Sequence, residues 1–226
     1  MIRKISRHLS LAITLELAAG FVISLGALWA FAELAEVVFE GETRQLDTAV
    51  LLWIHSTFPG WLDTPMRLVT SLGYPWVAVP LLLLAVYIFY RNDLRFSAAL
   101  LLISVPGAAV LSTVLKGLFE RARPELFDSG YEAPFYSFPS GHAVTAVSFY
   151  GVLTLLVAWR LEGWSRWVAV VAGTLLMLLV GFSRLYLGVH YPSDILAGYL
   201  AATLWVGTVG MALTLWRSLR SVKRCG

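Results

Sequence analysis

The sequence predicts an all-α integral membrane protein, a bundle of six transmembrane helices in a single domain that covers residues 1–226. Of its 226 residues, 58% are hydrophobic and 14% are charged, whereas a soluble globular chain has roughly 25% charged residues. A core of this size cannot hide so many apolar side chains, so lipid must cover part of them. Six apolar runs supply the spans, and no internal repeat or low-complexity linker divides the chain.

Each apolar run is predicted to form one helix that crosses the membrane. About 20 helical residues are needed to cross the hydrocarbon layer. The second run is shorter than this and is expected to begin earlier, near Leu72. The first run is longer than the roughly 7–15 apolar residues of a cleavable signal peptide, so we expect a true span. The runs are Leu9–Phe31, Trp76–Tyr90, Phe96–Leu115, Ala143–Trp159, Trp167–Phe182 and Ile195–Trp216.

The basic residues predict the orientation of these spans in the inner or plasma membrane. If the N-terminus is cytoplasmic, eleven of the 17 Lys and Arg residues flank the cytoplasmic ends of the spans. Cytoplasmic flanks of membrane proteins carry such an excess, so both termini are expected in the cytoplasm. Residues 32–72 then connect the first two spans on the outer side. Apolar patches alternate there with acidic residues, and we expect short interfacial helices.

Three polar segments interrupt apolar sequence at the outer ends of the last four spans. They read KGLFERARP (residues 116–124), PSGH (139–142) and SRLYLGVHYPSD (183–194). Ionisable groups at this depth are costly, which makes these segments candidates for a functional site.

In the first segment, Lys116 and Arg123 lie two helical turns apart and share one face if the helix continues to Arg123. Pro124 then ends or bends this helix. Glu120 lies between the two cations, where it is placed to hold one or both of them. Taken alone, the segment also fits a basic belt at a helix end.

In the second segment, Ser140 and Gly141 come just before the first turn of the fourth span. Exposed N–H groups and the positive end of the helix dipole form an anion site there. Glycine lets the backbone approach the anion closely. His142 stands beside this site and could donate a proton to a bound anion, although a capped interfacial histidine would look the same.

The third segment places a histidine and a carboxylate between the last two spans. Asp194 follows His190 by four residues and can fix the tautomer of its ring, as the carboxylate of a catalytic triad does. Arg184 presents a planar fork that matches phosphate oxygens, and Pro192 suits the start of the sixth span. A polar, well-capped turn is the alternative for this segment alone.

Together, these groups suit phosphoryl transfer without a metal ion. Cations can neutralise the charge on phosphoryl oxygens, and the sequence shows no obvious acidic cluster that would bind Mg²⁺. The single cysteine, Cys225, allows neither an internal disulfide nor a CxxC metal site. We therefore expect no metal and no cofactor. The basic residues sit at span ends and not in a patch with exposed aromatic residues, so no nucleic-acid partner is expected.

The three segments resemble the three-part signature of the type 2 phosphatidic acid phosphatase superfamily. Its parts here are Lys116-x6-Arg123-Pro124, Pro139-Ser140-Gly141-His142 and Ser183-Arg184-x5-His190-x3-Asp194. The resemblance implies a hydrolase of the integral-membrane branch, with a phosphohistidine intermediate on His190, orientation of His190 by Asp194, and protonation of the leaving oxygen by His142. It also implies that the phosphoryl group is held by Lys116, Arg123, Ser140, Gly141 and Arg184.

The substrate class follows from the position of the site. An outer interface walled by apolar helices suits a lipid phosphate whose head reaches the cations while its tail stays in the bilayer. The resemblance implies undecaprenyl pyrophosphate, phosphatidylglycerophosphate, phosphatidic acid or diacylglycerol pyrophosphate as substrate, and the compact size and outer placement favour the first two.

Two other functions are compatible with parts of this pattern. A lipid phosphotransferase of the same superfamily would share the histidine chemistry. A transporter that binds anionic solutes would use the cations but leave His190 and Asp194 without a task. The soluble vanadate-dependent haloperoxidases have a similar anion site, but the six apolar spans argue against them.

Overall fold

The computed structural model describes residues 2–127, 130–131 and 133–225, and every regular element within them is helical. The predicted all-α fold is therefore confirmed for this part of the chain. The elements are α1 (Ile2–Phe39), α2 (Arg44–Thr57), the 3₁₀ turn η1 (Gly60–Leu62), α3 (Asp63–Ser71), α4 (Pro75–Arg91), α5 (Arg95–Phe119), α6 (Gly141–Thr145), the π-helical turn η2 (Ala146–Gly151), α7 (Val152–Ala158), α8 (Gly163–Tyr186) and α9 (Pro192–Cys225).

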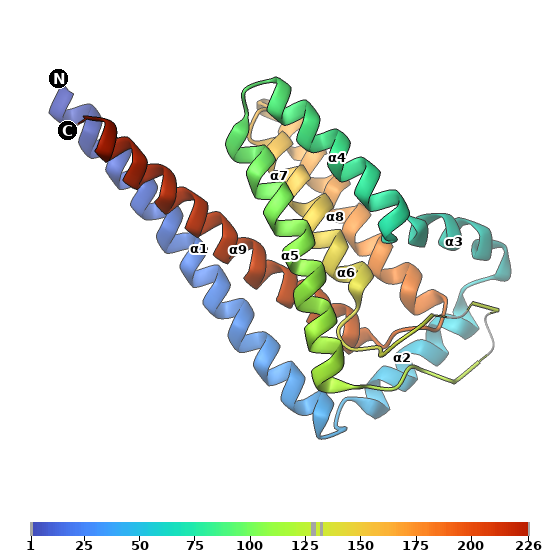
Figure 1. Ribbon diagram of the computed structural model, residues 1–226. Coiled ribbons are helices and arrows are strands. Elements are labelled where there is room, and N and C mark those ends of the chain that lie inside the picture. The colour runs from blue at the N-terminus through green and yellow to red at the C-terminus, as the bar shows by residue number, and fades with distance from the viewer. Residues whose placement is uncertain (1, 128–129, 132, 226) are drawn as a thin grey trace.

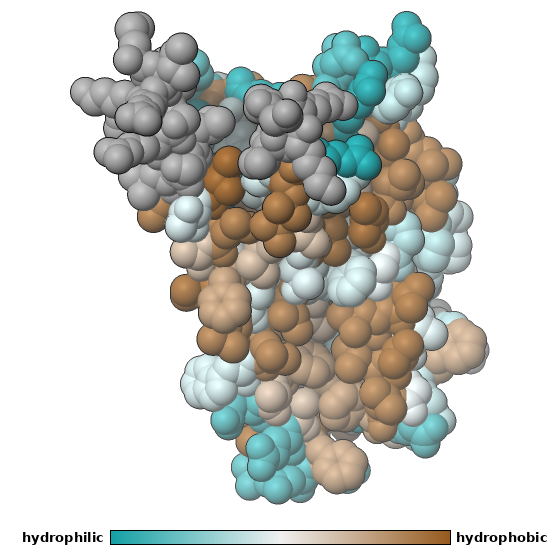
Figure 2. All heavy atoms as spheres, turned by 60° about the vertical axis from the view of Figure 1, so that its left-hand side comes forward, coloured by the Kyte–Doolittle hydropathy of each residue, from teal (hydrophilic) through white to brown (hydrophobic). Residues whose placement is uncertain are grey.

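Within the part of the chain that the structure describes, five helical segments are long and apolar enough to cross a membrane. They are Ile13–Phe39, Arg95–Phe119, Gly141–Ala158, Gly163–Tyr186 and Pro192–Arg220. The predicted second span is α4, which meets the η1–α3 segment at a bend of 48° and gives a sixth span if the bent pair is counted as one. Figure 2 shows a broad apolar band between more polar ends on one face of the molecule. The chain is therefore a multi-pass membrane protein, and its described residues contain five or six candidate spans.

The helices pack through small residues and close contacts. Because lipid tails are as apolar as leucine, packing and hydrogen bonds hold membrane helices together more than the hydrophobic effect does. On α5, Gly107 leaves room for Trp205 of α9, whose indole N–H donates to the carbonyl oxygen of Ser104 at 3.1 Å. The long helices α1 and α9 pack along each other, with the start of α1 beside the end of α9 (Figure 1).

The opposite end of the bundle carries a cap, which we define as α2, η1, α3 and residues 120–127, 130–131 and 133–140 (lower right in Figure 1). The short helices predicted between the first two spans are therefore present. A buried apolar cluster joins α2 and α3 to the end of α8, and it contains Ile54, Met66, Tyr186, Leu187 and Val189. The cap thus surrounds the ends of α5, α6, α8 and α9, where the three polar segments lie.

Candidate active site

The helix α5 ends inside the first polar segment. The helix ends at Phe119, and Glu120 adopts the left-handed conformation with φ of 46°. A shared helical face for Lys116 and Arg123 required the helix to continue to Arg123, and this condition is not met. Arg123 precedes a proline, which disfavours the helical conformation at that residue. The irregular segments 120–127 and 133–140, and not helical spacing, bring the two cations to the same site.

Lys116 is held by backbone carbonyl groups of the cap. Its Nζ donates to the carbonyl oxygens of Tyr136 at 2.6 Å and Ser137 at 3.4 Å. The sequence had suggested Glu120 for this task, but the cap carbonyls perform it. The ammonium group is therefore fixed in direction by the returning chain.

Arg123 forms hydrogen bonds both within the cap and with the segment between α8 and α9. Its Nε donates to the carbonyl oxygen of Phe135 at 2.9 Å, and its Nη1 donates to that of Val189 at 2.6 Å. The same Nη1 lies 3.2 Å from Nε2 of His190. Burial, followed by repulsion from Arg184, lowers the pKa of Arg123 to about 10, so the guanidinium stays charged at neutral pH.

His190 and Asp194 form a buried pair at the start of α9. Pro192 begins this helix and Asp194 lies in its first turn, as predicted. The Nδ1 atom of His190 lies 3.3 Å from Oδ2 of Asp194, which also accepts from the backbone N–H of Tyr191 at 2.8 Å. A carboxylate only accepts hydrogen bonds, so it assigns the ring proton to Nδ1. The lone pair of Nε2 then faces the cations.

The charge state of His190 follows from its surroundings. The residue is 2% exposed. Burial, followed by repulsion from Arg184 and Arg123, lowers its pKa well below the usual 6.5. At neutral pH the ring is therefore uncharged, and its Nε2 can act as a nucleophile.

The second polar segment begins the helix α6 at Gly141, with Ser140 as its N-cap. His142 is buried, and its Nε2 has no hydrogen-bond partner among the described residues. Its ring lies against the bend between α3 and α4, where a Cβ atom on Gly73 would be 2.2 Å from Cδ2 of His142. Only glycine leaves room for the ring in this position.

Arg184 is 1% exposed and lies in the last turn of α8. Its Nη1 donates to Oγ1 of Thr70 at 2.8 Å and to the hydroxyl of Tyr131 at 3.1 Å. Its Nε has no partner among the described residues. Buried donors of this kind need an acceptor, and phosphate oxygens are the acceptor that a guanidinium fits.

The structure brings the eight predicted residues to one end of the bundle. His190 contacts Asp194 and Arg123 directly, while Lys116 and Arg184 interact with it electrostatically. Ser140 joins them through its backbone N–H, which donates to the carbonyl oxygen of Asp194 at 3.0 Å. No group of three His, Cys, Asp or Glu side chains that could hold a metal ion occurs within the described residues.

Sequence reasoning missed several residues that hold this site. Thr70 and Tyr131 fix Arg184, and Gly73 accommodates His142. Arg121 and Asp47 bind beside Asp194. Arg121 lies inside the first polar segment, whereas Asp47 lies among other acids between the first two predicted spans and has no motif around it.

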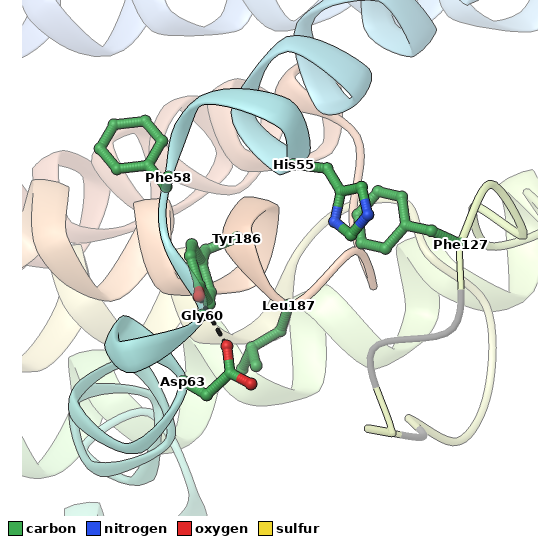
Figure 3. A pocket seen from close by; sticks show the side chains of 7 residues that line it. All are labelled: His55, Phe58, Gly60, Asp63, Phe127, Tyr186 and Leu187. Carbon is green, nitrogen blue, oxygen red and sulfur yellow. Dashed lines mark hydrogen bonds between the residues drawn. The ribbon is translucent and has the colours of Figure 1, made fainter.

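A separate cavity of about 230 Å³ lies in the cap, and none of the eight predicted residues lines it. Figure 3 shows His55 stacked on Phe127 at one side of it, and Tyr186 bonded to Asp63 at the other. The Tyr186 hydroxyl donates to Oδ1 of Asp63 at 2.6 Å, which ties α8 to α3.

Comparisons with known proteins agree on one family. The family model described as PAP2 superfamily matches residues 97–218. Phosphatidylglycerophosphatase B of Bacillus subtilis is 35% identical over 144 residues, which cover 62% of this chain and 69% of the relative. Undecaprenyl-diphosphatase of Sulfolobus acidocaldarius is 34% identical over 145 residues, which cover 62% of this chain and 64% of the relative, less than two thirds of its length.

A solved structure has the same arrangement of helices. The crystal structure of the transmembrane PAP2 type phosphatidylglycerolphosphate phosphatase from Bacillus subtilis superimposes with a TM-score of 0.75. The match covers 82% of this chain and 93% of that one, at 26% sequence identity.

Proposed function

The chain belongs to the PAP2 superfamily and is a membrane hydrolase of lipid phosphate esters, and from this premise we propose that it hydrolyses undecaprenyl pyrophosphate or phosphatidylglycerophosphate through a phosphohistidine on His190. The reaction uses no metal ion, and one domain of residues 1–226 carries it out. The names of the two relatives support these lipids, since one is a phosphatidylglycerophosphatase and the other an undecaprenyl-diphosphatase.

The observation that carries the proposal is the geometry of His190. Its Nδ1 bonds to Asp194 and its Nε2 faces Arg123. A neutral imidazole with a fixed tautomer, surrounded by cations that attract a phosphoryl group, is a nucleophile prepared for attack on phosphorus.

In the first step, the Nε2 lone pair of His190 attacks phosphorus and the bond from phosphorus to the leaving lipid oxygen breaks. His142 donates a proton to that oxygen. In the second step, water attacks the phosphohistidine and His142 accepts its proton. The phosphorus–nitrogen bond breaks, its electron pair returns to Nε2, and phosphate leaves.

The phosphoryl group lies among three cations in this proposal. Lys116, Arg123 and Arg184 neutralise the charge on its oxygens, and the Ser140 hydroxyl and the Gly141 N–H donate from the start of α6. Preorganised donors stabilise the transition state most when they are fixed before the substrate arrives. The contacts of Lys116 and Arg123 with cap carbonyls provide that rigidity.

The site lies on the extracytoplasmic side of the inner or plasma membrane in this proposal. The excess of basic residues around both termini supports this orientation. The cap and the site share one end of the bundle, opposite the start of α1 and the end of α9. The lipid head therefore enters from the outer leaflet while its tail stays between lipid-facing helices.

The test is phosphate release by the purified protein in detergent with EDTA. Wild type is expected to release phosphate from undecaprenyl pyrophosphate or phosphatidylglycerophosphate, and His190→Ala to release none from either. Equal release by both proteins would overturn the assignment of His190. Transfer of the phosphoryl group to an alcohol without phosphate release would instead identify a lipid phosphotransferase.

A further inference from the structure

Four side chains form a hydrogen-bonded unit behind His190, which we call the Arg121 network: the partly buried Arg121 and the buried Asp47, Ser193 and Asp194. Arg121 bridges two carboxylates, because its Nη1 donates to Oδ1 of Asp194 at 2.6 Å and its Nη2 donates to Oδ2 of Asp47 at 2.8 Å. Ser193 completes the unit. Its hydroxyl donates to Oδ2 of Asp47 at 2.5 Å and accepts from Nη1 of Arg121 at 2.7 Å.

The network is largely shielded from solvent. The side chains of Asp47 and Asp194 are 3% and 0% exposed, and that of Arg121 is 15% exposed. Burial alone disfavours the charged form of Arg121, but Asp194 and Asp47 outweigh it and raise the pKa above its ordinary value. A buried charge is costly unless it is paired and hydrogen-bonded. Removing Arg121 therefore leaves two carboxylates without their cation.

Arg121 fixes the rotation of the Asp194 carboxylate. Oδ1 is held by Arg121, and Oδ2 accepts from the backbone N–H of Tyr191 and faces Nδ1 of His190. With both oxygens held, the carboxylate cannot turn away from the imidazole. Asp47 holds the other end of the guanidinium from α2 and also accepts from the backbone N–H of Ser193 at 3.1 Å.

We propose that Arg121 and Asp47 are positioning residues that hold Asp194 against His190. The inference rests on the proposed roles of His190 and Asp194 in hydrolysis, and it extends the catalytic machinery to α2 of the cap. Asp47 lies outside the 97–218 segment that the family model matches. Because Asp47 lies on α2, its proposed positioning role makes the cap part of the active centre and not only a cover over it.

The contacts of Arg121 distinguish it from a phosphate ligand. Both of its Nη atoms are engaged by side chains of the network. The guanidinium also lies over the ring of Tyr191, with 4.3 Å from Cζ to the ring centre. Arg184 differs, since its buried Nε has no partner among the described residues. Arg121 thus acts on the phosphate only through Asp194 and His190.

Loss of Arg121 also changes the charge that His190 experiences. The charged and titratable groups that face His190 are Asp194 on α9, Lys116 on α5, Arg184 on α8, Arg123 in residues 120–140 and His142 on α6. Without Arg121, the charge of Asp194 is no longer neutralised, which favours the protonated imidazole. The acidic limb of kcat/KM then moves to higher pH.

The experiment compares Arg121→Gln, Arg121→Lys and Asp47→Asn with wild type, using detergent-solubilised protein and a lipid phosphate substrate. Arg121→Gln is expected to lower kcat by about 100-fold with KM nearly unchanged, the cost of a misplaced reacting group. Arg121→Lys keeps the charge and is expected to recover part of this loss. Asp47→Asn is expected to lower kcat by about 10-fold, since Arg121 keeps Asp194 but loses its own anchor.

Two comparisons decide whether the network acts through Asp194. In combination with Asp194→Asn, Arg121→Gln is expected to add no further loss, because residues that act as a unit are not additive. Tyr186→Phe is the matched control. It removes another partly buried hydrogen bond between the cap and α8, and it is expected to leave kcat and the pH profile unchanged.

Several results would overturn the inference. A raised KM with unchanged kcat would make Arg121 a phosphate ligand, and an additive loss with Asp194→Asn would separate it from His190. An equal loss in Tyr186→Phe would indicate general loosening of the cap. If Arg121→Gln does not fold, Asp47→Asn and Arg121→Lys decide on the same measurements. Activity of His190→Ala would refute the proposed function itself, whereas inactive His190→Ala beside fully active network variants would refute only this inference.

Discussion

Asp194→Asn removes one negative charge from the site and replaces one hydrogen-bond acceptor with a donor. Oδ1 of Asp194 accepts from Arg121 at 2.6 Å, and Oδ2 accepts from the backbone N–H of Tyr191 at 2.8 Å. An asparagine can serve only one of these donors with its oxygen, and its NH₂ group then faces the other. The charged guanidinium forms the stronger bond, so the amide oxygen is expected to face Arg121 and the NH₂ group to face His190.

This orientation gives His190 the wrong tautomer. The NH₂ group donates to Nδ1, so the ring proton moves to Nε2, where it faces Nη1 of Arg123. The lone pair that attacks phosphorus is no longer available. The same exchange in a serine-protease triad lowers kcat by about 10,000-fold, and we expect a loss of about 1,000- to 10,000-fold here. That corresponds to about 4–5.5 kcal/mol in the activation free energy.

The assay is the initial rate of phosphate release, with the inhibition constant of orthovanadate as a measure of anion binding. Asp194→Asn is expected to lower kcat and leave vanadate inhibition within about threefold, since the three cations remain. Asp63→Asn is the matched control, because it makes the same exchange in a cap acid whose carboxylate accepts from Tyr186 and lies outside the predicted site. A kcat for Asp194→Asn within about tenfold of wild type would refute the tautomer argument.

Two other predictions concern His142 and the charge around His190. Gly73→Ala places a Cβ atom 2.2 Å from the His142 ring, so the ring must move. We expect kcat to fall by about 100-fold. The loss of kcat is expected to be smaller for substrates with a more acidic leaving group. If the loss is the same for good and poor leaving groups, His142 is not the proton donor. The pKa of His190 is lowered by burial and by repulsion from Arg184 and Arg123. Because Arg123→Gln removes one of these cations, we expect the acidic limb of the pH profile of kcat/KM to move to higher pH. An acidic limb that stays in place would exclude His190 as the titrating base.

The candidate spans and the grouping of the candidate site residues could be predicted from the sequence because both depend on strong local signals. Apolar runs predict spans, since hydrocarbon must be crossed by uncharged residues. Ionisable residues at the ends of such runs are costly, which singles out Arg184, His190 and Asp194. Start signals also worked, since Pro192 begins α9 as expected and Ser140, expected just before the first turn, is the N-cap of α6.

The parts that could not be predicted depend on the path of the chain between helices. Helical spacing placed Lys116 and Arg123 on one face, but the left-handed Glu120 ended α5 before Arg123. The bend between α3 and α4 depends on a break at residues 72–74, after which Pro75 starts a new helix. Asp47 has no local signal, because its contacts reach Ser193, 146 residues further along the chain.

The covalent step on His190 is the central claim, and trapping it is the most direct measurement. The purified protein is mixed with a lipid phosphate that carries radiolabelled phosphorus, quenched in alkali, and digested for mass spectrometry. The account predicts an acid-labile, alkali-stable label on the peptide that contains His190, absent from His190→Ala and present in reduced amount in Asp194→Asn. Turnover by wild type without such a label, or a label on another residue, would contradict it.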